Sequence, residues 1–210
     1  MPKATGRKPQ GRASDAPDTR TRIRRAAAAQ FARRGYAGTG LKQIAAEAPA
    51  PFGSIYHFFP GGKDDLAEDM IRTTGPQFMR LVLGVLAERD DPVEAVEHTF
   101  AAAARDLAAN DYADGCPIAT MALDVASTND RLRAAAADVF GEWTDGGIAW
   151  FTRWTGDAAR AADLARTMIM IIEGAFLLSR TTRDPEPLHA AGRSMAALLR
   201  AARTDLSARG

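Results

Sequence analysis

The stretch TGLKQIAAEAPAPFGSIYHFFPGGK, residues 39–63, decides the fold expected for this chain. Its first part repeats apolar residues at positions i, i+3, i+4 and i+7, which predicts a short helix over Leu41–Ala48. Pro49 and Pro51 then end that helix, because proline lacks an N–H and restricts the residue before it. A second short helix is expected over Phe52–Phe59, where the following Pro-Gly-Gly ends it. The stretch therefore predicts two short helices joined by a tight turn.

Length and composition exclude several classes of protein. The chain has 210 residues, 46% of them apolar, which is enough to bury a substantial core. Its single cysteine, Cys116, excludes an internal disulfide and a four-cysteine zinc site. No stretch approaches the roughly 18 apolar residues of a membrane span, and no signal-peptide core is present at the N-terminus. We expect a soluble cytoplasmic protein without a cofactor or metal ion.

Basic charge is concentrated in the N-terminal part of the chain. Residues 1–63 contain 12 Lys and Arg against 3 Asp and Glu, whereas the remaining residues contain 15 against 23. A basic segment attached to an acidic body suits binding to a phosphate backbone, where counterion release supplies much of the affinity. Charge alone fits a solvated basic terminus equally well.

Apolar periodicity, caps and breakers predict an all-α chain. Residues 1–17 carry Pro, Gly and basic side chains with almost no apolar residue, so a disordered basic arm is expected there. A bend is expected at Gly75-Pro76 and a break at Gly146-Gly147. The other expected helices are Thr19–Arg34, Lys63–Leu86, Pro92–Asn110, Ile118–Ser127, about 130–154, Ala158–Arg180 and Pro185–Ala202.

Three segments carry a resemblance to a known family. They are FARRGYAGTG at residues 31–40, LKQIAAEA at 41–48 and GSIYHFFPGGKDDL at 53–66. Together they resemble the DNA-binding domain of the TetR family of transcriptional regulators. The resemblance implies a three-helix helix-turn-helix domain over residues 18–64, followed by a larger helical ligand-binding and dimerisation domain over 65–205. GSIYHFFPGGK and the later GCPIATMALDVA are similar to a branch that responds to multi-ring aromatic compounds.

The resemblance places the second short helix in the major groove of DNA. Such a helix presents its N-terminal residues to base edges, while other contacts fix the phosphate backbone. Tyr56 and His57 would bind phosphates, and Thr39 and Lys63 would hold the backbone on either side. Ser54 offers a hydroxyl, and a glycine beside it allows close approach. The expected DNA-binding residues are Thr39, Lys42, Pro51, Phe52, Gly53, Ser54, Tyr56, His57 and Lys63.

The chain departs from the family pattern at three positions. Glycine is usual where this chain has Pro49, a basic residue is frequent at Phe52, and a polar residue is common at Phe58. We expect a turn with backbone angles that proline permits, and weaker or unusually specific DNA binding. Ile44 and Ile55, by their spacing, are expected to be core residues, as is Phe59.

Aromatic residues accumulate between residues 140 and 154, which include all three tryptophans of the chain. With apolar residues of other helices they could line a cavity for a bulky apolar or aromatic ligand, with His98, Asp124 or Cys116 as polar groups. An ordinary helical core is the alternative for each of them. The expected ligand-binding residues are Phe78, Val82, Phe100, Cys116, Met121, Phe140, Trp143, Trp150 and Ile172.

The last two helices resemble the dimer-forming pair of the family. The helix over Ala158–Arg180 is apolar on more than one side, particularly at Met168–Ile172, and therefore requires partners on two sides. The resemblance implies a homodimer in which these helices and their two-fold copies form a four-helix bundle. A two-fold dimer would present two reading helices to a palindromic operator of double-stranded DNA.

The expected function is a ligand-responsive repressor that leaves its operator when a small molecule binds the larger domain. An activator and a regulator with no small ligand are alternatives. A helical interaction protein that has lost DNA binding is another, for which Pro49 and Phe52 are the best argument. An enzyme is not expected, because His57, His98 and His189 lack metal-ligand spacing and no nucleophile motif is present.

Overall fold

The structure is a computed structural model that describes the backbone of residues 18–207 and the side chains up to residue 202. The arm expected over residues 1–17 lies outside the described residues. Within them the chain forms nine α-helices and no strand, which confirms the all-α prediction. The helices are α1 (Thr19–Arg34), α2 (Leu41–Glu47), α3 (Phe52–Phe58), α4 (Lys63–Leu86), α5 (Pro92–Ala109), α6 (Pro117–Val125), α7 (Asp130–Thr155), α8 (Ala158–Thr182) and α9 (Glu186–Ser207).

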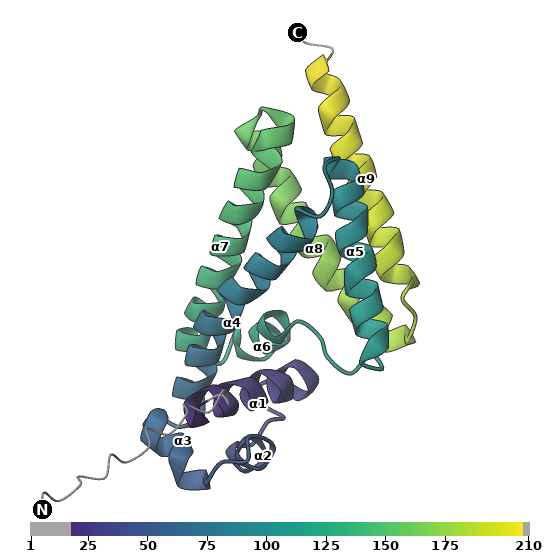
Figure 1. Cartoon of the computed structure of the whole chain (residues 1–210). Coiled ribbons are helices and arrows are strands. Elements are labelled where there is room, and N and C mark those ends of the chain that lie inside the picture. Colours follow the sequence, from purple (N-terminus) through teal and green to yellow (C-terminus); the bar gives the residue numbers. More distant parts are fainter. Residues whose placement is uncertain (1–17, 208–210) are drawn as a thin grey trace, which may run out of the picture.

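The helices form a small group and a larger body (Figure 1). Helices α1, α2 and α3 gather at the N-terminal end, and α4 runs from this group into the body. In the body α5 packs along α9 and α7 packs along α8. Helix α6 lies between the two parts and packs on α1 and α7. Two helices, α4 and α6, therefore connect the small group to the body.

Polar caps set the starts of several helices. Asp18 caps α1, where its carboxylate accepts a hydrogen bond from the Thr21 N–H at 2.8 Å. Asp91 caps α5, and Asp157 caps α8 in the same manner. Helix α1 ends at Gly35, whose φ of 69° is a conformation that glycine adopts without steric cost. The expected helix boundaries agree with the structure within one or two residues except at the end of α9, which was expected at Ala202 and lies at Ser207.

One apolar core joins the small group to the lower body. Ile23 and Phe31 of α1 pack with Ile44, Ile55 and Phe59, and each of the five side chains is buried, which confirms the core roles expected for the last three. The same cluster includes the first half of α4, the apolar face of α6 and the first half of α7. The three-helix unit is therefore continuous with the body in its packing.

A second core fills the upper body between α5, α8 and α9. Phe100 and Leu107 of α5 are buried there against Leu188 and Met195 of α9. The far ends of α4 and α7 also belong to this cluster. The two cores meet along α4 and α7, because each of these helices contributes to both.

Glycines allow three helices to approach closely. A Cβ on Gly147 would lie 2.9 Å from the Ala165 Cβ of α8, and one on Gly75 would lie 2.4 Å from a Val139 methyl of α7. The break expected at Gly146-Gly147 is wrong, since α7 continues through both residues and uses their small size for packing. Helix α4 likewise stays unbroken through Pro76. The Gly75 carbonyl accepts a hydrogen bond from the Trp143 indole N–H at 2.9 Å.

Helix α8 buries one apolar face and exposes another. Met168 and Ile172 point into the body, whereas Met170, Leu177 and Leu178 are exposed to solvent. The two-sided apolar pattern of the sequence is therefore present in the structure, with one side uncovered in the single chain. Among the helices that the structure describes, none is long and apolar enough to cross a membrane.

Candidate DNA-binding and effector sites

Helix α3 presents its first turn to solvent. Pro51 is the N-cap residue, and Phe52 and Gly53 follow on the exposed side. The described residues leave open space around a Cβ built on Gly53. Ile55 and Phe59 on the opposite side anchor the helix in the core beneath it. The first turn of α3 is thus accessible to a DNA groove, as the sequence indicated.

Two aromatic side chains stand together on this surface. The rings of Phe52 and Tyr56 meet edge to face with centroids 5.7 Å apart, and the two residues are 42% and 48% exposed. Exposed apolar surface of this kind can contact a thymine methyl group, and the Tyr56 phenol can donate to a phosphate. Ser54 is half-buried beside them.

Thr39 does not reach the surface, which departs from its expected contact with the DNA backbone. Its residue is 2% exposed, and its hydroxyl lies 2.7 Å from the Gly35 carbonyl and 3.2 Å from the Gln30 carbonyl. A hydroxyl has one proton to donate, and here it is directed to the backbone of the same domain. Thr39 therefore fixes the loop between α1 and α2, whose N-cap is Gly40.

The lysine and histidine residues expected to bind DNA differ in their surroundings. Lys42 and His57 are exposed, so their side chains are free to reach a phosphate. Lys63 is half-buried, with its Nζ 4.2 Å from the centroid of the Tyr36 ring. Burial lowers the pKa of Lys63, while the nearby Asp64 and Asp124 carboxylates oppose that effect. Lys63 thus lies at the base of the three-helix unit.

The turn between α2 and α3 is strained at Pro49. Its φ is 25°, in the positive region that favours glycine, whereas the proline ring prefers a φ of about −65°. The expectation that this turn adopts angles permitted by proline is wrong. The turn closes through the Ala50 N–H, which donates to the Ala45 carbonyl at 3.1 Å. Pro49 therefore occupies the geometry of the glycine usual in the family.

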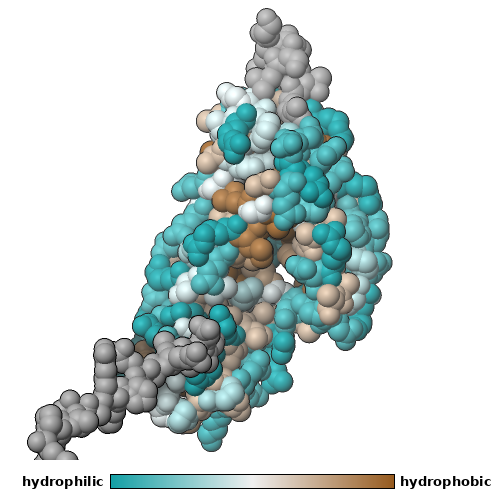
Figure 2. Space-filling view, in the orientation of Figure 1, coloured by the Kyte–Doolittle hydropathy of each residue, from teal (hydrophilic) through white to brown (hydrophobic). Residues whose placement is uncertain are grey.

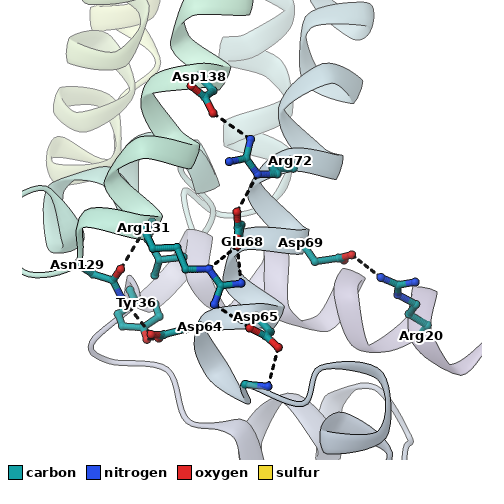
Figure 3. A network of polar contacts seen from close by, with 12 residues as sticks. Arg20, Tyr36, Asp64, Asp65, Glu68, Asp69, Arg72, Asn129, Arg131 and Asp138 are labelled. Atoms are coloured by element: carbon teal, nitrogen blue, oxygen red, sulfur yellow. Dashed lines mark hydrogen bonds and ion pairs between the residues drawn. The ribbon is translucent and has the colours of Figure 1, made fainter.

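Charged residues of α4 tie the three-helix unit to α7 (Figure 3). Arg131 of α7 lies between two carboxylates of α4, 2.8 Å from Asp65 and 2.5 Å from Glu68. Arg72 extends the group by binding Glu68 and Asp138, each at 3.0 Å. The pKa of Asp65 is lowered first by the Gly61 N–H and then by Arg131, and that of Glu68 first by Arg72.

The same acidic part of α4 also binds α1. Arg20 and Arg24 both contact the Asp69 carboxylate, at 2.7 and 2.5 Å. Figure 3 shows the Arg20 contact. The Tyr36 hydroxyl donates to Asp64, which also accepts a hydrogen bond from the Asn129 amide. Part of the basic face of α1 is thus neutralised within the protein. Sequence reasoning counted these arginines as positive surface and did not anticipate their partners on α4.

Helix α6 connects the cavities of the body to the three-helix unit. At its C-terminal end the Asp124 carboxylate accepts a hydrogen bond from the Ala37 N–H at 3.2 Å. Just before its N-terminal end Asp114 binds Arg33 of α1 at 2.7 Å. Asp124 therefore lies at the domain junction and does not line the cavities described below. Cys116 is the N-cap residue of α6 and borders two cavities.

Three adjoining cavities occupy the body. The inner cavity, of about 60 Å³, lies between α4, α7 and α8. The middle cavity, of about 210 Å³, lies between α4, α5 and the α5–α6 loop, and the outer groove, of about 600 Å³, lies between α6 and α8. Figure 2 shows hydrophobic surface gathered near the middle of the face it presents, with hydrophilic surface around it. Small-molecule sites usually measure about 300–1,000 Å³, so only the outer groove reaches that range without movement.

Seven of the nine residues expected to bind a ligand line these cavities. Phe78, Val82 and Ile172 separate the inner cavity from the middle one, while Trp143 and Trp150 line the inner cavity alone. The others are Cys116, which borders the middle cavity and the outer groove, and Phe140, which lines the outer groove.

The other two residues, and one proposed polar group, lie elsewhere. Phe100 is buried between α5 and α9, where its Cβ would be 2.8 Å from a Cβ on Gly192. Met121 is buried in the first core. His98 lies 2.9 Å from the Glu88 carboxylate and belongs to the α4–α5 connection. None of the three lines a cavity described above.

Glu173 is the site residue that sequence reasoning missed. It borders both the inner cavity and the outer groove, and burial raises its pKa to about 7, partly offset by a hydrogen bond with Cys116. The same burial raises the pKa of the Cys116 thiol. The available signal was a carboxylate directly after the apolar run Met168–Ile172, on a helix that needs apolar partners on two sides.

The structure combines an exposed helix, α3, on a three-helix unit with a body that contains cavities. The two parts are joined through α4 and α6, and this arrangement is typical of one class of protein. The class is that of two-domain helix-turn-helix regulators of transcription, in which one part binds DNA and the other controls it.

Comparisons with known proteins identify the family. The family described as bacterial regulatory proteins, tetR family, matches residues 23–70, and that described as transcriptional regulator LmrA/YxaF-like, C-terminal domain, matches residues 92–194. The uncharacterized HTH-type transcriptional regulator YxaF of Bacillus subtilis is 35% identical over 175 residues, which cover 81% of this chain and 90% of the relative. LmrA of the same organism is 29% identical and covers 81% and 91%. This chain belongs to the TetR family of transcriptional regulators.

Solved structures agree with this assignment at the level of the fold. The regulatory protein TetR from Rhodobacter sphaeroides superposes with a TM-score of 0.77 at 22% identity, covering 86% of this chain and 98% of the other. A TetR regulator from Chloroflexus aurantiacus gives 0.71 at 28% identity, with 85% and 92% covered. Members of the family bind operator DNA as dimers and are regulators, not enzymes.

Proposed function

We propose that this protein is a repressor that leaves a palindromic operator when a bulky apolar or aromatic small molecule binds in its body. One observation carries the proposal: α4 and α6 each contact the three-helix unit and also line cavities, α4 at its opposite ends and α6 along its length. In α4 the first turns hold Asp65 and Glu68 of the junction, and the last turns hold Val82 and Leu83 of the inner cavity wall.

Ligand entry would change the position of α4 and α6. The inner and middle cavities are smaller than a multi-ring compound, so their walls must separate to admit one. Any displacement of α4 moves α1 with it, because Asp69 binds Arg20 and Arg24. The two reading helices of a dimer would then no longer match major grooves about 34–36 Å apart. The size of the effect is limited by the difference in ligand affinity between the two arrangements.

Base contacts are proposed for the exposed first turn of α3. Phe52, Gly53 and the Ser54 hydroxyl would face base edges, with Pro51 at their start. Phosphate contacts are proposed for Tyr56 and for the cationic or basic side chains Lys42, His57 and Lys63. Replacing Phe52 with Arg would add a phosphate contact and steepen the dependence of log K on log salt by up to about one unit. An unchanged slope would place Phe52 outside the interface.

The proposed dimer interface consists of the exposed faces of α8 and α9. Met170, Leu177 and Leu178 form an uncovered apolar stripe on α8, and the first two also line the outer groove. Leu198 is exposed on α9. Uncovered apolar surface of this extent typically marks an interface. Replacing Leu177 with Glu is expected to shift the protein toward monomer in analytical ultracentrifugation at micromolar concentration. A wild-type protein that is monomeric there yet binds a palindrome tightly would contradict the proposed interface.

Fluorescence anisotropy with the DNA upstream of the protein's own coding region tests the main proposal. The expected result is sequence-selective, salt-dependent binding that weakens when a suitable multi-ring aromatic compound is added. Gly53→Glu provides the DNA-binding control, because its Cβ meets open space while its carboxylate would repel phosphate. Absence of selective binding would contradict the proposal that α3 binds DNA. Compounds that only strengthen DNA binding would contradict the proposed release from the operator.

A further inference from the structure

We propose that the effector of this protein is an aromatic or apolar cation, an amine or quaternary ammonium compound, whose positive charge pairs with the Glu173 carboxylate. This inference rests on the proposed function only in assuming that the body cavities bind a small molecule. It adds the chemical class of that molecule and the residue that selects it.

Glu173 lies where its carboxylate can contact a ligand bound in the body. It lies on the wall shared by the inner cavity and the outer groove, and is therefore accessible to a molecule that occupies either space. Its Oε1 atom is buried and has no hydrogen-bond partner among the described residues. A buried polar atom without a partner costs free energy, and a buried charge costs more. A ligand that supplies the missing partner recovers this cost on binding.

The walls around Glu173 favour a positive charge. The inner cavity presents the aromatic rings of Phe78, Trp143 and Trp150 next to the carboxylate. Aromatic faces attract cations through their quadrupole, and tryptophan does so most strongly. The remaining lining of the inner cavity is apolar apart from backbone, so Glu173 is its single ionisable side chain within the described residues. Aromatic faces beside one carboxylate form a site for an organic cation.

The other ionisable groups near Glu173 do not neutralise it. The Cys116 thiol faces the carboxylate, and its own pKa is raised chiefly by burial, so it stays neutral. The Arg180 guanidinium lines the outer groove but donates to the backbone carbonyls of Tyr112 and Ala113, at 3.4 and 3.0 Å. Arg180 therefore holds the α5–α6 loop and leaves the Glu173 Oε1 without a cationic partner.

The ionisation of Glu173 gives the inference a testable pH dependence. Burial raises its pKa to about 7, so the side chain is a mixture of acid and carboxylate near neutral pH. A cation binds the carboxylate form, and its affinity should therefore increase from pH 6 to pH 8 and then level off. A neutral ligand should show no such increase.

The test uses three probes of matched shape and different charge, namely naphthylmethyl-trimethylammonium, neopentylnaphthalene and naphthylacetate. Binding to the full chain, without DNA, is followed by intrinsic fluorescence, because two of the three tryptophans line the inner cavity. The expected order of affinity is cation above its neutral isostere, with the anion weakest. Glu173→Gln should reduce affinity for the cation by about 10- to 100-fold and abolish its pH dependence. The matched control is Glu142→Gln, at an exposed carboxylate of α7.

Three results would overturn the inference. Equal affinity of the cation and its neutral isostere would exclude a role for charge, and tighter binding of the anion would assign the site to Arg180. Loss of the neutral probe together with the cation in Glu173→Gln would indicate a structural role only. A cation that binds through Glu173 but leaves operator binding unchanged would sustain this inference and contradict the proposed release mechanism.

Discussion

The junction at the N-terminal end of α4 is tightly packed, whereas the region at its C-terminal end contains cavities. At the junction, Phe31, Ile55 and Phe59 are completely or almost completely buried, and Arg131 bridges two carboxylates of α4. In the cavity region the same helix borders the inner and middle cavities, whose walls include half-buried Phe78. Tight packing transmits displacement, whereas empty volume permits it. The lower part of α4 is thus suited to pass on a movement that begins in the upper part.

The largest expected difference between the regions is the cost of removing a ring. Phe59→Ala should destabilise the protein by about 3–5 kcal/mol, because it opens a cavity in a filled core. Phe78→Ala should cost less than about 2 kcal/mol, because that ring already borders empty space. Urea denaturation of both variants measures the contrast. Equal losses would show that the two regions are packed alike.

A second contrast concerns the response of stability to pH. Glu173 has a folded-state pKa of about 7 against an ordinary value of 4.5, so the folded state holds its proton more tightly. Its contribution to the free energy of unfolding, on the order of 3 kcal/mol, is present below pH 4.5 and is lost as the pH rises toward 7. Asp65 and Glu68 have lowered pKa values, so their contribution is present above their ordinary values and is lost as the pH falls further.

Denaturation of wild type and Glu173→Gln between pH 3 and pH 8 separates these contributions. The variant should lose the decline in stability between about pH 4.5 and 7 and keep the acid-side loss that the junction carboxylates cause. The control Glu142→Gln should follow the wild type. A Glu173→Gln curve parallel to that of wild type would show that this carboxyl has an ordinary pKa in the folded state.

A larger side chain should stabilise the protein in the cavity region and destabilise it at the junction. Ala103→Leu adds methyl groups to the wall of the middle cavity and should stabilise the protein by up to about 1 kcal/mol. Ala27→Leu places the same groups at a fully buried position of α1 and should cost about 1–3 kcal/mol. Thermal unfolding of the pair tests this, and destabilisation by both would argue against usable volume near α5.

The smallest expected effect lies in the reading unit. Pro49→Gly should stabilise by about 1 kcal/mol, because relief of the strained φ of 25° exceeds the greater flexibility of glycine in the unfolded chain. Differential scanning calorimetry measures the change, with Pro51→Gly at the N-cap of α3 as a comparison without positive φ. A lower melting temperature for Pro49→Gly would show that proline is well accommodated in this turn.

Regular features of the fold could be predicted from the sequence because they depend on local signals. Asp18 and Gly35 delimit α1 as caps should, and the apolar spacing placed Ile44 and Ile55 in the core. The break predicted at Gly146-Gly147 was wrong because a glycine can either end a helix or let another helix approach closely. That choice depends on Ala165, a residue of α8 that sequence spacing does not bring near.

The candidate sites were only partly predictable for a related reason. The exposure of Phe52 and Tyr56 agrees with their expected place on the outer side of α3, while their contacts with DNA stay a prediction. The inward direction of Thr39 depends on carbonyl groups at the end of α1 and at its C-cap, Gly35. The state of Glu173 depends on burial among residues of other helices. Both properties arise from packing, which the residue types alone do not specify.

The small volume of the inner cavity should limit how fast a ligand can bind there. A multi-ring compound cannot enter about 60 Å³ at the moment of collision, so binding there must wait for α4, α7 and α8 to separate. The observed rate of association would then level off with ligand concentration at the rate of this opening. The delay between the arrival of an effector and the release of DNA would be set by the protein's own motion, however abundant the effector becomes.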